Sequence, residues 1–158
     1  MHHRRATGEG GDAKKFDLSD GKGRLTKEIL SEGQGPTIPR GKLAKVLYTG
    51  KLESGRELGV SEGDDPVEFV VGNGNVVEGL DEGILTMQQG ERAIFYISPE
   101  LAFGQEGKYP DIPENQSVVY DVELMGWRDP PTIDPLSAAL LAVGAIIAGV
   151  FYLGSMST

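Results

Sequence analysis

The sequence predicts an α+β fold in which one short helix packs against the concave face of an antiparallel sheet of about five strands. Several short segments alternate apolar and polar residues with the period of a strand. One segment instead places apolar residues at helical spacing. Turn-forming glycines and prolines separate these segments. The 158 residues are enough for one ordinary domain with appendages.

The residue pattern predicts strands over residues 24–30, 42–53, 67–71, 91–98 and 117–127. Residues 67–71 are assigned from their β-branched and aromatic side chains. In the alternating strands, the positions that share one face are Ala44, Val46, Tyr48, Ala93, Phe95, Ile97, Val118, Tyr120, Val122 and Leu124. Asp121 and Glu123 lie between the last of these, so the final strand should bury one face and expose the other.

The predicted helix lies between the third and fourth strands. Leu80, Ile84 and Met87 fall at positions i, i+4 and i+7, which gives one narrow apolar stripe. Gly90 is well placed to end the helix as a C-cap residue. Because two or three turns are too short to be stable alone, this helix must pack on the sheet.

Composition excludes several classes of function. A formal net charge of −9 and a pI near 4.7 argue against a nucleic-acid partner, which would need a concentrated basic face. The chain has no cysteine, and its two histidines, His2 and His3, lie near the N-terminus. The predicted domain therefore offers no Ser-His-Asp triad, and we expect no catalytic side chain, metal site or cofactor.

The domain itself is predicted over residues 23–128. Residues 1–22 are rich in glycine and charge and predict a flexible tail. No apolar segment follows Arg4–Arg5, so a secretory signal is excluded, whereas a processed organelle-targeting remnant stays open. Residues 129–135 contain three prolines and predict a stiff linker.

Residues 136–154 predict a transmembrane helix. The uncharged, nearly continuous apolar run from Leu136 to Leu153 would span about 27 Å as a helix, which matches a bilayer core. A small soluble domain could not cover a helix that is apolar on every face. Small residues recur at spacings of four, three and four at Ala138, Ala142, Ala145 and Gly149. They allow close approach by other transmembrane helices, although ordinary membrane-helix composition explains them equally well.

The predicted span resembles a single-pass C-terminal tail anchor. A glycolipid-anchor signal is the competing interpretation, but it requires entry into the secretory pathway. Arg128 is the only basic residue near the span, so the orientation signal is weak and favours a domain on the cytoplasmic, stromal or matrix side. The organelle stays open between the endoplasmic reticulum, the mitochondrion and the chloroplast thylakoid.

Four motifs follow one another in the predicted domain. They are YTGKLESGREL (48–58), VEFVVGNGNVVEGLDEGI (67–84), GERAIFYISPELAFGQEG (90–107) and IPENQSVVYDVEL (112–124). In order and spacing the domain resembles the FKBP-type peptidyl-prolyl isomerases, or immunophilins. The resemblance implies a curved antiparallel half-barrel around the helix. It also implies rotation of X-Pro bonds in proline-containing peptide segments or client proteins, a reaction in which no covalent bond is made.

The resemblance further implies a substrate-binding pocket. Residues that match the family's pocket are Tyr48, Val76, Val77, Ile112 and Tyr120, and Phe103 stands where the family usually has a tyrosine. In the family, the N–H group at the position of Val77 binds the ligand carbonyl. Residues that depart from the family are Leu58 and Gly59, which replace a Phe-Asp pair, Val67, which replaces a wall Phe, and Leu80, which replaces the Trp floor.

These departures predict weak or absent isomerase activity and the loss of tight macrolide binding. A leucine floor leaves a deeper, less defined cavity, and the missing acid removes a hydrogen-bonding partner. Two functions follow from this pocket. One is a membrane-anchored prolyl isomerase or folding assistant. The other is a non-catalytic FKBP-like binding module or accessory subunit of a membrane protein complex.

Two other patterns have simpler explanations. Gly72 and Gly74 resemble part of a nucleotide-binding fingerprint, but no third glycine has the required spacing, so a turn is favoured. Glu62, Asp64 and Asp65 do not have the spacing of an EF-hand, which favours a solvated acidic loop over a calcium site.

Overall fold

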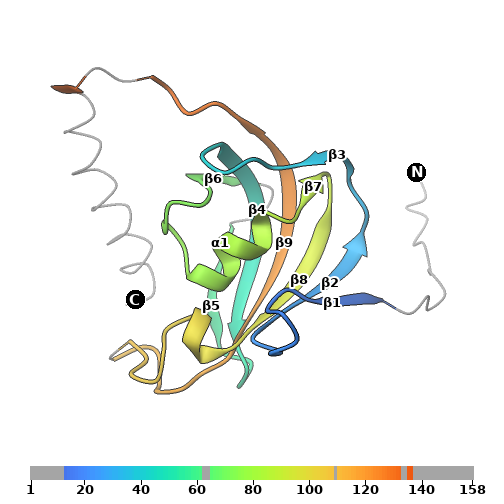
Figure 1. Cartoon of the computed structure of the whole chain (residues 1–158). Helices are drawn as coiled ribbons and strands as arrows, with labels where there is room; N and C mark the ends of the chain where they lie inside the picture. Colours follow the sequence, from blue (N-terminus) through green and yellow to red (C-terminus); the bar gives the residue numbers. More distant parts are fainter. Residues whose placement is uncertain (1–12, 62–64, 109, 133–134, 137–158) are drawn as a thin grey trace, which may run out of the picture.

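A computed structural model describes residues 13–61, 65–108, 110–132 and 135–136 of the chain (Figure 1). Its strands are β1 (Lys14–Asp17), β2 (Leu25–Ser31), β3 (Gln34–Thr37), β4 (Leu43–Leu52), β5 (Glu57–Val60), β6 (Val67–Val70), β7 (Gln88–Gln89), β8 (Arg92–Ile97) and β9 (Val118–Arg128). Its helices are α1 (Glu78–Ile84) and the short 3₁₀ helix η1 (Pro99–Leu101). The predicted α+β class is confirmed.

One antiparallel sheet of seven strands organises the described part of the chain, in the order β1-β2-β8-β9-β4-β5, with β6 also pairing with β4. The longest pairing joins β4 to β9, from Leu43 opposite Arg128 to Leu52 opposite Val118. A register shift between Lys45 and Val46 interrupts this pairing. Strands β3 and β7 form a separate two-stranded sheet. The large sheet curves around α1, which lies on its concave side (Figure 1).

The core lies between α1 and this concave face. The predicted alternation is confirmed in β8, where Ala93, Phe95 and Ile97 are buried, and in β9, where the four apolar positions from Val118 to Leu124 are buried. The predicted apolar stripe also faces the core, because Leu80, Ile84 and Met87 are all buried.

Two glycines bring α1 close to β8. A Cβ atom on Gly79 would lie 2.4 Å from Cγ2 of Ile97, and one on Gly83 would lie 2.7 Å from the Phe95 ring. These positions are one helical turn apart and therefore on the same face of the helix. The absence of side chains at both positions is what lets the helix sit directly on the strand.

The helix ends earlier than the sequence predicts. The prediction that Gly90 is its C-cap is wrong, because α1 ends at Ile84. The amides of Thr86 and Met87 donate to carbonyls three residues earlier, at 3.1 and 2.9 Å, which tightens the chain into a turn. Gln88 and Gln89 then pair with β3, and Gly90 (φ = +82°) makes the turn into β8.

Ordered structure also begins earlier than the predicted domain boundary. The sequence predicts a flexible tail over residues 1–22, but Lys14–Asp17 forms β1 and pairs with β2. The Asp17 carboxylate accepts hydrogen bonds from the amides of Ser19 and Gly23, at 2.8 and 2.9 Å, and these bonds hold the turn between β1 and β2. Backbone pairing and side-chain capping produce this hairpin, so apolar periodicity could not predict it.

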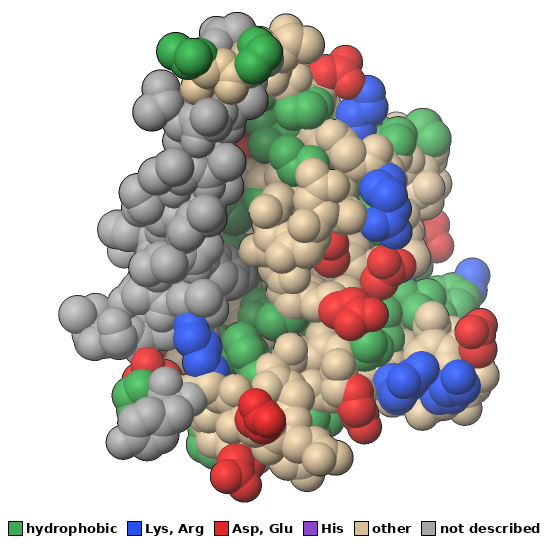
Figure 2. Space-filling model, turned by 60° about the vertical axis from the view of Figure 1, so that its left-hand side comes forward, with side chains coloured by type: hydrophobic (Ala, Val, Ile, Leu, Met, Phe, Trp, Pro, Cys, Tyr) green, Lys and Arg blue, Asp and Glu red, His purple; other side chains and the backbone are tan. Residues whose placement is uncertain are grey.

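Charged side chains of both signs are interspersed over the face shown in Figure 2. Ion pairs among the described residues join Arg92 to Asp121, Arg128 to Glu68, and Lys42 to Asp129. Among the residues that the structure describes, no helix is both long and apolar enough to cross a membrane. The predicted span over residues 136–154 lies outside the described residues except for Leu136, which is exposed.

Candidate functional site

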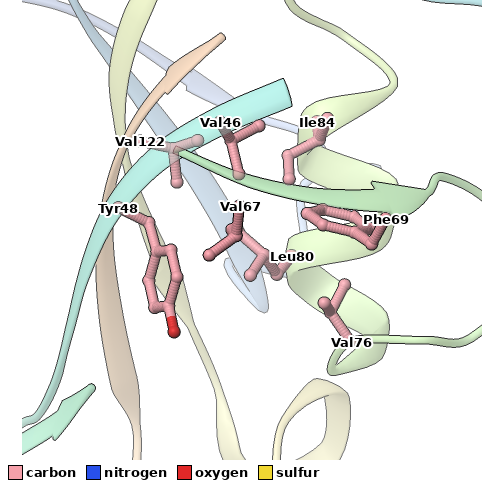
Figure 3. A pocket seen from close by; sticks show the side chains of 8 residues that line it. All are labelled: Val46, Tyr48, Val67, Phe69, Val76, Leu80, Ile84 and Val122. Atoms are coloured by element: carbon pink, nitrogen blue, oxygen red, sulfur yellow. The ribbon is translucent and has the colours of Figure 1, made fainter. Parts of the chain in front are cut away.

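An apolar pocket opens between the sheet and α1 (Figure 3). It encloses about 240 Å³ of unoccupied space, part of which is continuous with solvent. Side chains from β4, β6, β9, α1 and the loop before α1 line it: Val46, Tyr48, Val67, Phe69, Val76, Leu80, Ile84 and Val122.

The lining determines what this pocket can do chemically. Among the eight lining side chains, the Tyr48 hydroxyl is the one polar group. The hydroxyl end of the Tyr48 ring points away from Val46 and Ile84 (Figure 3). The walls can therefore take up an apolar group and exclude water from it, and they carry no nucleophile or general base.

Tyr48 is held by a second tyrosine and approached by a glycine. Its ring centroid lies 6.3 Å from that of Tyr120, and the two rings are tilted by 47°. A Cβ on Gly50 would lie 2.5 Å from the Tyr120 ring, so this position on β4 must be a glycine for Tyr120 to lie flat against the strand. A Cβ on Gly59 would lie 3.4 Å from the Tyr48 hydroxyl oxygen, which is ordinary contact.

The structure brings four of the predicted pocket residues together as lining: Tyr48, Val67, Val76 and Leu80. The other six lie outside the lining. Leu58, Val77 and Phe103 are half-buried against the core, whereas Ile112 and Tyr120 are buried within it. Gly59 lies on β5, beside Tyr48.

Four lining residues were not predicted from the sequence: Val46, Phe69, Ile84 and Val122. Strand and helix periodicity carries the signal for each. Phe69 lies two residues after Val67 on β6, Val46 lies two before Tyr48 on β4, and Ile84 lies one turn after Leu80. Phe69 matters most, because it supplies an aromatic wall in a pocket whose predicted wall and floor positions, Val67 and Leu80, are aliphatic.

The loop before α1 adds backbone donors at the pocket edge. In the described part of the chain, the Val77 N–H has no acceptor and no side chain caps the helix start. Gly72 and Gly74 adopt φ of +85° and +73° in the preceding turn, so the turn interpretation of this segment is confirmed. In the described ranges no three His, Cys, Asp or Glu side chains gather as a metal site, and residues 62–64 of the predicted acidic loop lie outside them.

A second, wider depression lies near β5 and the β8–β9 pair. It holds about 460 Å³ of space between Leu47, Thr49, Val60, Ser61, Arg92, Asp121 and Glu123, and it also touches Tyr48. Arg92 donates two hydrogen bonds to Asp121, at 3.0 and 2.8 Å, and this contact raises the pKa of the guanidinium. Since its main charges already neutralise each other, this depression offers less to a ligand than the apolar pocket.

Comparison with known proteins places this geometry in a family. The family model for FKBP-type peptidyl-prolyl cis-trans isomerases matches residues 35–125. FK506-binding protein 59 of Drosophila melanogaster is 39% identical over 119 residues, which cover 74% of this chain and 27% of the Drosophila protein. FK506-binding protein 1A of Aspergillus fumigatus is 36% identical over 104 residues, covering 65% of this chain and 93% of that protein.

A solved structure agrees with these sequence matches. The N-terminal domain of FKBP42 from Arabidopsis thaliana superimposes with a TM-score of 0.67 at 26% sequence identity. The match covers 77% of this chain and 98% of the Arabidopsis domain.

Proposed function

The chain belongs to the FKBP-type peptidyl-prolyl cis-trans isomerase family, and we propose that its apolar pocket binds proline-containing segments of client proteins while accelerating their isomerisation only weakly. The observation that carries this proposal is the pocket itself. It is lined by Tyr48, Val76 and Leu80 and contains no charged side chain. A proline ring is an apolar group, and such a lining can take it up without leaving a polar group unpaired.

The reaction suits a pocket without reactive groups. Rotation about an X-Pro bond loses amide resonance and faces a barrier of about 18–20 kcal/mol. The twisted amide is less polar than the planar one, so a water-excluding apolar wall stabilises it selectively. The Val77 N–H, which has no acceptor in the described part of the chain, can hold the carbonyl of a bound segment.

The weak isomerase activity that we propose follows from the residues at four positions. Leu58 and Gly59 lack the aromatic ring and the acid that the family resemblance leads us to expect, and Val67 and Leu80 lack aromatic rings in the wall and floor. An aliphatic floor fixes the orientation of a proline ring less sharply than an indole does. Relatives are named as FK506-binding proteins. For this chain we propose that tight macrolide binding is lost for the same reason.

A membrane location is the second part of the proposal. Residues 136–154 would anchor the domain to a membrane, with small residues available for contact with other transmembrane helices. The competing function is a non-catalytic accessory subunit of a membrane protein complex. The aliphatic floor at Leu80 favours it, because binding without turnover needs only the apolar wall and the backbone donor.

Two assays separate these functions. The first measures proline-limited isomerisation of a peptide by the full chain, and the second identifies proteins that co-purify with it in mild detergent. Turnover with a monomeric chain supports the isomerase. Negligible turnover with stoichiometric co-purification of a membrane complex supports the subunit. A rate comparable to that of an efficient family member would contradict the proposed weakness.

A further inference from the structure

The glycine-rich loop between β6 and α1 is tied down by a buried carboxylate. The Asp81 side chain, on α1, accepts a hydrogen bond from the Gly72 amide at 2.6 Å and another from the Gly74 amide at 3.0 Å. Asp81 is 6% exposed. Hydrogen bonds to an ionised acceptor are stronger than those between neutral groups. Both carboxylate oxygens are therefore used to hold backbone rather than to contact solvent.

An arginine holds the same loop from the other side. Arg40 donates to the Gly72 carbonyl at 2.8 Å and to the Glu82 carboxylate at 3.2 Å. A Cβ on Gly72 would lie 2.5 Å from Cγ of Arg40, so the contact requires a glycine. Asn75 adds a bond from its side-chain amide to the Val70 carbonyl, at 2.9 Å. Charged groups of opposite sign thus fix the amide and the carbonyl of Gly72.

This loop leads directly into the pocket. Val76 lines it, and Val77 precedes the first residue of α1. The Asp81 amide donates to the Val77 carbonyl at 3.0 Å. Asp81 therefore contacts both ends of the segment, through its side chain at Gly72 and Gly74 and through its backbone at Val77. Among the described residues, no other makes hydrogen bonds to both parts of this loop.

We propose that Asp81 is a positioning residue, whose carboxylate sets the place of Val76 and the direction of the Val77 N–H for a bound proline-containing segment. The inference rests on the proposed function of the pocket. An asparagine at this position keeps one carbonyl acceptor but turns an NH₂ group towards the other glycine amide. That amide then loses its charged acceptor, and the loop must move or take up solvent to restore one.

The test compares the full chain with Asp81→Asn in mild detergent, with Glu78→Gln as the matched control. Glu78 is an exposed acid on the same helix, and its side chain makes no hydrogen bond or ion pair with the described part of the chain. Amide hydrogen exchange is followed by NMR at Gly72, Gly74 and Val77 and across β9. Affinity for a short proline-containing peptide is measured by titration of the same samples.

The expected result is selective. Asp81→Asn should speed exchange at the Gly72 or Gly74 amide and weaken peptide binding about ten-fold, which corresponds to about 1.4 kcal/mol. Exchange in β9 should stay unchanged, and Glu78→Gln should match the wild type. A general loss of stability would instead speed exchange throughout the sheet, and this outcome overturns the positioning role.

Different results would contradict the positioning role of Asp81 and the proposed function of the pocket. If the wild type binds the peptide and Asp81→Asn binds it equally well, the positioning role is wrong and the proposed function stands. If the wild type binds no peptide but the loop amides and the Val77 signal respond selectively to Asp81→Asn, the loop-positioning role stands and the proposed function falls. Unchanged loop amides overturn the inference in either case.

Discussion

Gly59 has no side chain and therefore leaves space beside the Tyr48 ring. A Cβ there would meet the Tyr48 hydroxyl oxygen at 3.4 Å and its Cε2 atom at 3.8 Å, both ordinary contacts. No positive φ stands in the way of a side chain, since Gly59 is not among the residues with left-handed backbone. A short acid therefore fits at this position, next to a pocket whose lining has one polar group.

Gly59→Asp should raise the isomerase activity of the full chain several-fold. The added carboxylate lies within reach of the Tyr48 hydroxyl, can accept its hydrogen bond and so fixes the Tyr48 ring at the pocket wall. The measurement is kcat/KM for a proline-limited peptide. Gly59→Ala is the control, because it adds the same Cβ without an acceptor and should leave kcat/KM near the wild-type value. Equal rates for the two variants would show that the missing acid does not limit activity.

At the level of elements, α1 depends on two positions that carry no side chain. Gly79 and Gly83 pack against Ile97 and Phe95 of β8. Helix propensity alone favours alanine over glycine by roughly 0.5–1 kcal/mol in a helix interior. Contact with the strand opposes this preference, and the distances decide which effect is larger.

Gly83→Ala should destabilise the domain by about 1–3 kcal/mol, because its Cβ would lie 2.7 Å from the Phe95 ring and force the helix away from β8. Denaturant unfolding measures the change in the free energy of unfolding. Glu78→Ala, at an exposed position of the same helix, should stay within about 0.5 kcal/mol of the wild type. A more stable Gly83→Ala variant would mean that helix propensity outweighs packing here.

A buried ion pair joins β2 to the start of β8. Lys27 Nζ lies 2.7 Å from the carboxylate of Glu91, and the two side chains are 5% and 4% exposed. The two groups form an ion pair, but the geometry at Oε2 of Glu91 is not that of a hydrogen bond. Lys27 also donates to the carbonyl and hydroxyl oxygens of Thr86, both at 3.0 Å, and so holds the turn that follows α1.

Lys27→Met should cost about 3–5 kcal/mol of unfolding free energy, because it leaves the Glu91 carboxylate buried without a partner. The double variant Lys27→Met with Glu91→Gln should recover part of that loss, since the uncompensated charge is gone. Denaturant unfolding of both variants measures the difference. If the double variant is no more stable than Lys27→Met, the cost comes from the lost Thr86 contacts rather than from the unpaired charge.

The elements that sequence periodicity predicts are those whose side chains bury one face. Strands β4, β8 and β9 were predicted from such alternation, β6 from its β-branched and aromatic side chains, and β2 from its residue pattern. Strands β1, β3, β5 and β7 form by backbone pairing of largely exposed residues, so their side chains carry little signal. The predicted end of α1 was wrong because the α-helical hydrogen bonds stop before Gly90. The amides of Thr86 and Met87 instead donate to carbonyls three residues earlier, and β7 then pairs with β3.

Part of the candidate site could likewise be predicted from the sequence, and part could not. Family positions identified Tyr48, Val76 and Leu80, and periodicity could have added Phe69 from Val67. The tie between Asp81 and Gly72 depends on the three-dimensional path of the loop and on the glycine conformations. Neither composition nor spacing contains that information.

At the scale of the whole molecule, both proposed functions place the domain at a membrane. Removing residues 136–158 from the chain should move it from the membrane fraction to the soluble fraction, because the apolar run is the feature that would insert into a bilayer. Fractionation of cells that express each form measures this change. A full chain that is found in the soluble fraction would contradict membrane anchoring and leave the pocket proposal intact.

The most direct measurement is the catalytic efficiency of the full chain, in mild detergent, on a peptide whose reaction is limited by X-Pro isomerisation. The aliphatic floor and wall at Leu80 and Val67, and the missing acid at Gly59, predict kcat/KM below about 10⁴ M⁻¹s⁻¹, the lower end of ordinary enzyme efficiencies. A value at or above about 10⁴ M⁻¹s⁻¹ would contradict this prediction. Such a value would mean that Tyr48, Phe69 and the Val77 N–H are sufficient for turnover.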